Sequence, residues 1–80
     1  MSRYIHFGKY SIQILHEFSL TEFTGIVFEN TDGQWKPLTS QQIKEMKAVE
    51  IDSLTYDVIW RRKEWIDMQL MCVCAFRLSR

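Results

Sequence analysis

Residues 66–78 read IDMQLMCVCAFRL, the longest regular pattern in the chain. Every even-numbered position in it is apolar, whereas the odd-numbered positions include aspartate, glutamine and arginine. Alternation with a period of two is typical of a β-strand that buries one face. We therefore predict a strand over the whole stretch.

The length of this strand constrains the fold. A straight strand from Trp65 to Leu78 would measure about 43 Å, whereas a compact domain of this size is only about 30 Å across. We therefore expect the strand to bend, as in a barrel, or to project and pair with another chain. The second arrangement would make a homodimer through the long C-terminal strand.

A second alternating run precedes the first and consists of Leu54, Tyr56, Val58 and Trp60. The two runs together predict an antiparallel hairpin, with residues 61–64 as its turn. The alternative is a helix through this region, because Leu54, Val58 and Trp65 also fit one helical face. The alternation is the longer and cleaner pattern, so we favour the hairpin.

The N-terminal half of the chain predicts three strands, over residues 4–18, 23–30 and 34–38. Residues 10–18 alternate, which places His16 on the apolar face, and Gly8 marks a bend or a tight turn. Gly33 supplies the positive φ angle for a turn after the second strand. Pro37 lacks a backbone N–H, so the third strand lies at a sheet edge or ends there.

One helix is predicted over residues 39–49. Thr39 is suited to cap it, and Gln42, three residues later, completes a capping box. Leu38 and Ile43 occupy the two positions of a hydrophobic staple. These local features agree on where the helix begins.

The elements follow the order β-β-β-α-β-β, with the first strand long or broken, which predicts an α+β fold in one domain, residues 1–80. Two architectures fit this order. One is an antiparallel sheet with a single helix packed on one face. The other is a small, partly open barrel of the OB type, which also places a helix between its third and fourth strands.

Composition and charge exclude several classes of protein. The chain is 46% hydrophobic, and its ten basic residues balance ten acidic ones. It therefore exerts no long-range attraction on nucleic acid or on anionic membranes. The N-terminus lacks the apolar segment of a signal peptide, and no apolar run approaches the roughly 20 residues that span a bilayer. We expect a cytoplasmic protein without membrane association, in which Cys72 and Cys74 are buried, reduced thiols.

The most distinctive local feature is the segment WRRKEW, residues 60–65. On the hairpin interpretation, Arg61, Arg62 and Lys63 form a basic tip flanked by two tryptophans. Guanidinium groups bind phosphates or carboxylates, and indole rings offer stacking surfaces. The alternative is a solvated turn whose tryptophans anchor the hairpin in the core. Trp65 is the better candidate for an exposed contact, because Trp60 shares the parity of the buried residues.

Two further observations bear on binding. Four acidic residues and no basic ones lie between Lys9 and Lys36, so the two halves of the chain differ in charge. Segregated charge in a neutral protein suits a specific protein interface better than phosphate binding, although four solvated carboxylates are the simpler interpretation. The chain also has 11 aromatic residues and four methionines. We include Trp35, beside Lys36, among the aromatic side chains expected to contact a partner.

Catalytic and metal-binding signatures are weak. The sequence predicts no catalytic residues, no cofactor and no metal site. His6 and His16 with the Cys-x-Cys pair do not match the usual spacing of zinc ligands. The three glycines are isolated, and no nucleophile motif or phosphate-binding loop is present. An enzyme would have to be a small nuclease or toxin that uses His6 or His16 together with Arg61.

The sequence therefore predicts a non-enzymatic domain that binds a larger protein, as an accessory or inhibitory factor analogous to those that phages and mobile elements encode. The predicted contact residues are Trp35, Arg61, Arg62, Lys63 and Trp65. The alternative is an OB-like protein that binds single-stranded nucleic acid through residues 61–63, with Trp65 and Trp35 as stacking platforms. A small nuclease or toxin is the third class.

Overall fold

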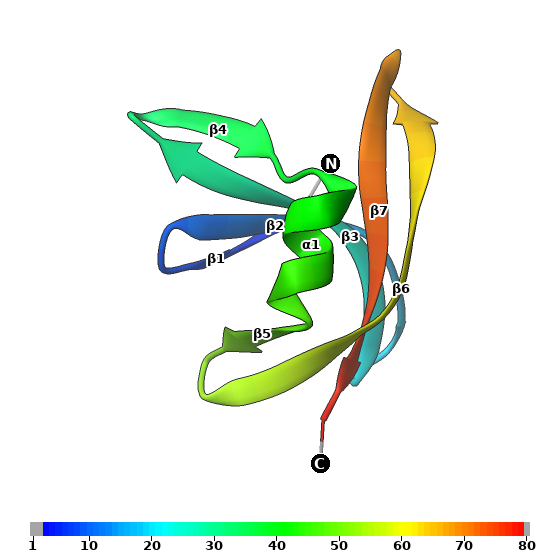
Figure 1. The fold of residues 1–80 in the computed structure, drawn as a ribbon. Coiled ribbons are helices and arrows are strands. Elements are labelled where there is room, and N and C mark those ends of the chain that lie inside the picture. Colours follow the sequence, from blue (N-terminus) through cyan, green and yellow to red (C-terminus); the bar gives the residue numbers. More distant parts are fainter. Residues whose placement is uncertain (1–2, 80) are drawn as a thin grey trace.

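A computed structural model describes residues 3–79 and shows seven strands and one helix within this range (Figure 1). In chain order these are β1 (Arg3–Phe7), β2 (Tyr10–Ser19), β3 (Glu22–Thr31), β4 (Gln34–Pro37), α1 (Ser40–Met46), β5 (Ala48–Ile51), β6 (Leu54–Ile66) and β7 (Gln69–Leu78).

The strands form one antiparallel sheet that is nearly closed. Its order is β1-β2-β3-β7-β6-β5, and β4 pairs with the second half of β3. The sheet curves until β1 and β5 approach each other, and α1 lies on its concave side (Figure 1). The predicted α+β class, with one helix on a mainly antiparallel, barrel-like sheet, is confirmed. We call the concave side the inner face and the convex side the outer face.

The C-terminal hairpin is present, but its predicted turn was wrong. β6 continues through residues 61–64 to Ile66, which pairs with Gln69. The turn consists of Asp67 and Met68, whose φ angles are 49° and 68°. Two successive positive φ angles match the right-handed twist of the flanking strands. This turn usually has the sequence Asn-Gly, Asp-Gly or Gly-Gly. Asp67 fits the first position, but Met68 stands where the glycine is usual.

The same turn interrupts the stretch that was predicted as one long C-terminal strand. Residues 66–78 are divided between β6, the turn and β7, and the molecule measures 33 × 27 × 25 Å. The apolar residues at even-numbered positions on the two sides of the turn do not share a face. Ile66 lies on the opposite face from Leu70, so the continued alternation is a coincidence. The expectation of a homodimer rested on the long strand and has no such basis in this fold.

A bulge in β6 reverses the face on which its side chains lie. Val58 pairs with Phe76, but Trp60 pairs with Ala75, so Ile59 is an extra residue. Val58 packs against the core, whereas Trp60 lies on the outer face. The prediction that Trp60 shares the parity of the buried residues was therefore wrong, because an extra residue shifts the alternation.

Two irregularities also modify the N-terminal strands. The first predicted strand is divided into β1 and β2 by a turn at Gly8, whose φ angle is 56°. In β2 the pairing with β3 shifts between Ile14 and His16. His16 consequently lies exposed on the outer face, opposite Thr24, and not on the apolar face as predicted.

The start of α1 follows the prediction. The backbone N–H of Gln42 donates to the Thr39 Oγ1 at 3.2 Å, and the Thr39 N–H donates to the Gln42 Oε1 at 2.9 Å. Ile43 is buried in the core. The helix ends earlier than predicted, at Met46, because Lys47 adopts a positive φ angle of 59°. The chain then continues as β5, an edge strand whose first two residues had been predicted as the end of the helix.

The inner face carries the main core, which α1 covers. Its buried members are Ile12, Ile14, Phe23, Val27, Leu38, Ile43, Val49, Ile51, Cys72, Cys74 and Phe76. Gly25 is required here, because a Cβ atom at this position would lie 2.6 Å from the Ile12 Cγ2 and 2.7 Å from the Gln13 carbonyl oxygen.

The two cysteines are free and buried, as predicted. Their Sγ atoms lie 3.9 Å apart on the inner face. Burial, followed by the proximity of Cys72, raises the pKa of the Cys74 thiol to about 12. Cys74 is therefore protonated at neutral pH and behaves as a small apolar side chain.

Candidate functional site

The three predicted cations do not form a tip. Arg61 and Lys63 pair with Cys74 and Cys72, so they lie on the inner-face side of β6. Arg62 pairs with Val73 and lies on the outer face. Because successive residues of a strand point in opposite directions, this basic run is divided between two surfaces.

Arg62 is already occupied by its neighbours. Its Nε atom forms an ion pair with the Glu64 Oε1 on the same face. Its guanidinium carbon also lies 5.2 Å from the centre of the Trp60 ring, which is a cation–π distance. Arg62 therefore extends the aromatic surface around Trp60 and adds little net positive charge.

The end of the β6–β7 hairpin is apolar. The Trp65 side chain is 75% exposed, and Met68 in the turn is 92% exposed. Leu70, which pairs with Trp65, is also exposed. Lys63 lies closer to the body of the protein, in a groove beside Leu38 and the start of α1. The hairpin extends beyond the N-terminal end of α1 (Figure 1).

Trp35 lies apart from the cluster of residues 61–65. It is on β4 and faces outward, with its ring centre 5.9 Å from that of His6. Tyr4, Ser11 and Phe28 join these two residues around a cavity of about 320 Å³. The structure therefore does not bring the five predicted contact residues together as one site.

The outer face has a small core of its own. Five of its residues are buried although α1 lies on the other side of the sheet, namely Ser11, Thr24, Ile26, Val73 and Ala75. Strand pairing places His16, Thr24, Ala75 and Trp60 in one row across β2, β3, β7 and β6. The two small central residues are thus flanked by larger rings at both ends of the row.

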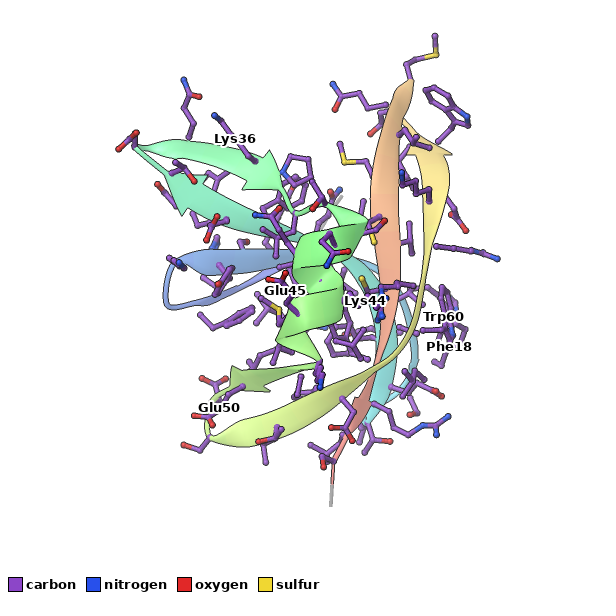
Figure 2. All side chains as sticks on the ribbon, viewed as in Figure 1. Phe18, Lys36, Lys44, Glu45, Glu50 and Trp60 are labelled. Carbon is purple, nitrogen blue, oxygen red and sulfur yellow. The ribbon has the colours of Figure 1, made fainter. Side chains whose placement is uncertain are left out.

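These rings remain accessible to solvent. The His16 and Phe18 rings meet edge to face, with their centres 4.5 Å apart, and Phe18 is 57% exposed. Figure 2 shows Phe18 and Trp60 pointing away from α1, on the outer side of the sheet. We define the outer aromatic face by seven residues: Tyr4, His6, His16, Phe18, Phe28, Trp35 and Trp60.

The acidic segment of the sequence is not an acidic surface. Glu17 pairs with Arg3, Glu22 with Arg77 at 3.1 Å, and Glu29 with Lys9 at 3.0 Å. Glu29 raises the pKa of Lys9, chiefly through a hydrogen bond. Cations from distant parts of the sequence therefore neutralise three of the four carboxylates. The charge asymmetry predicted from the sequence is largely removed by folding.

The residues considered for metal binding or catalysis are separated by the sheet. His6 and His16 lie on the outer face, whereas the two cysteines and Arg61 lie on the inner side. Within residues 3–79, no three side chains of His, Cys, Asp or Glu come together as metal ligands. Over the same range, no helix has the length and apolar character needed to cross a membrane.

No family model, curated protein or solved structure matches this chain.

The outer aromatic face went unnoticed in the sequence because its members are scattered over five strands. A partial sign was present in residues 4–7, where aromatic or apolar side chains occupy both parities of β1. Strands with two apolar faces are normally buried on both sides. The bulges that turn His16 and Trp60 outward leave no recognisable sequence pattern.

Proposed function

We propose that this chain is a non-enzymatic protein-binding domain that docks on a larger protein through its outer aromatic face. The observation that carries the proposal is the second layer of packing on the convex side of the sheet. There, small buried residues such as Ala75 are surrounded by rings that remain exposed, including Phe18 and Trp60. Aromatic residues are enriched in the cores of protein interfaces, where they contribute a large share of the binding energy.

The distribution of charge favours a protein over a nucleic acid as the partner. Tracking a phosphate backbone requires several cations on one surface. Within residues 61–63, Arg62 lies on the outer face and the other two cations lie on the inner side. Arg62 is also paired with Glu64. A largely neutral aromatic surface is better suited to an apolar patch on a protein. An accessory or inhibitory role would follow if docking blocked or completed a site on the partner.

Affinity purification from the native cell, under conditions that preserve complexes, tests the proposal. The wild-type chain is compared with Trp60→Ala and with the matched control Trp65→Ala, each verified as folded by circular dichroism. We expect one stoichiometric partner that Trp60→Ala loses and Trp65→Ala retains. Retention by Trp60→Ala together with loss by Trp65→Ala would move the binding site to the hairpin end and contradict the proposal.

The nucleic-acid alternative has its own test. Anisotropy of labelled single-stranded DNA and RNA is measured at low and moderate salt with the wild type and with an Arg61/Arg62/Lys63→Ala variant. We expect no binding by either protein. Binding that weakens with salt and disappears in the variant would replace the protein-binding proposal.

A further inference from the structure

The outer aromatic face contains a pocket, formed where β1, β2, β3 and β4 meet. Its volume is about 320 Å³, and its walls are Tyr4, His6, Phe28 and Trp35. Ser11 lies between His6 and Phe28 in the strand pairing and completes the lining. Pockets for small ligands begin at about 300 Å³, so this one is suited to a single ring system.

Ser11 contributes a polar residue to the lining of the pocket. The residue is only 2% exposed, and its Oγ atom has no hydrogen-bond partner within residues 3–79. Buried hydroxyl groups almost always have a partner, because leaving one unpaired is unfavourable by about 1–3 kcal/mol. An aliphatic residue would fill this position of the sheet without that penalty. Ser11 lines the pocket, so a rotation of its side chain would present the hydroxyl to a polar atom that enters.

The aromatic walls define the shape of what can enter. The Tyr4 and His6 rings are nearly parallel, with an interplanar angle of 12° and centres 6.5 Å apart. The Trp35 ring is tilted by 48° against that of His6. Tyr4 and Trp35 are both about half exposed, so the pocket opens to solvent between apolar walls. A planar ring would contact these walls and leave its far end near Ser11.

We propose that this pocket receives the phenol ring of a tyrosine on the protein partner, with the tyrosine hydroxyl hydrogen-bonded to the Ser11 Oγ. This inference rests on the proposed function and names the chemistry at one end of the docking surface. A phenol hydroxyl both donates and accepts, as the serine hydroxyl does. The absence of Lys, Arg, Asp or Glu from the pocket lining matches a neutral ring.

The test needs no partner protein, so its failure is distinguishable from failure of the proposed function. N-acetyltyrosinamide and N-acetylphenylalaninamide differ only in the hydroxyl group. Each is titrated into the full chain and followed by NMR at the Ser11 amide and the Trp35 indole N–H. We expect both signals to shift in a saturable way, with the tyrosine derivative binding about fivefold more tightly, as one neutral hydrogen bond allows.

Two variants assign this preference to the hydroxyl. In Ser11→Ala the two ligands should bind equally, whereas in the exposed control Ser19→Ala the fivefold preference should remain. Equal binding by the wild type, or shifts confined to residues outside the pocket, would overturn the proposal.

A third probe distinguishes a ring site from a cation site, because aromatic cages also bind quaternary ammonium groups. Tetramethylammonium should leave the Ser11 and Trp35 signals unchanged. If it binds the pocket more tightly than N-acetyltyrosinamide, the pocket is a cation cage and the tyrosine assignment is wrong.

Discussion

The two faces of the sheet are built differently. The inner face buries aliphatic side chains and two phenylalanines, and α1 covers it. The outer face buries small residues such as Thr24 and Ala75, and its large rings stay accessible. Its hydroxyl at Ser11 is buried without a partner in residues 3–79. The inner face thus follows the rules for a stable core, whereas the outer face departs from them in ways that a partner would compensate.

This difference suggests a division of roles between the faces. A substitution on the inner face should change the free energy of unfolding, whereas one on the outer face should change binding more than folding.

The largest effect is expected from Phe76→Ala on the inner face. Phe76 is fully buried against Phe23, with ring centres 5.1 Å apart. Its removal should lower the free energy of unfolding by about 3–5 kcal/mol, through lost burial and the resulting cavity. The matched outer-face variant Phe18→Ala should lose about 1 kcal/mol or less. Urea denaturation measures both, and similar losses would contradict the division.

Gly25→Ala should have the next largest effect. The added Cβ would clash with the Ile12 side chain and with the Gln13 carbonyl oxygen, which is backbone and has little freedom to move. We expect a loss of about 1–3 kcal/mol in the free energy of unfolding. A neutral Gly25→Ala would show that the inner face is less tightly packed than described.

A smaller effect is expected from raising the pH. The pKa of Cys74 is raised in the folded state from its ordinary value of 9.0 to about 12. Between these values the unfolded chain has lost the thiol proton and the folded chain retains it, so stability falls as pH rises. From pH 8.5 to pH 10, the wild type should lose about 1 kcal/mol more than Cys74→Ala. Equal losses, measured by urea denaturation at each pH, would show that Cys74 titrates normally.

The smallest effect, and one of opposite sign, is expected from Ser11→Ala. Removing a buried hydroxyl that lacks a partner should raise the free energy of unfolding by up to about 1 kcal/mol. The same variant should lose the preference for a phenol ring. A decrease in stability would mean that the Ser11 hydroxyl serves the fold.

Local sequence features predicted the local structure well. The cap at Thr39 and the burial of Ile43 depend on residues a few positions apart, and both were predicted. The turn at Asp67 and Met68 was missed because Met68 occupies the position where this turn usually has a glycine, while the polar run before it resembled a turn. The position of β5 was missed because Lys47 ends the helix without a glycine.

The candidate site depended on features that are not local. The bulge at Ile59 turns Trp60 outward and divides the basic run between two faces. Ion pairs such as Glu22 with Arg77 join residues that are distant in the sequence. Neither effect appears in the periodicity or in the order of charges. Of the five predicted contact residues, Trp35 and Arg62 lie on the outer face.

Site-specific photo-crosslinking in the native cell tests the docking surface most directly. A photoreactive phenylalanine analogue is placed at Phe18 on the outer aromatic face, at Leu54 beside the β5–β6 turn, and at Trp65 near the hairpin end. Protein docking through the outer aromatic face predicts one discrete adduct from position 18 and none from position 54 or 65, with the adduct abolished by Trp60→Ala. An adduct from position 65 alone, or none from position 18 in a chain that still captures its partner, would contradict it.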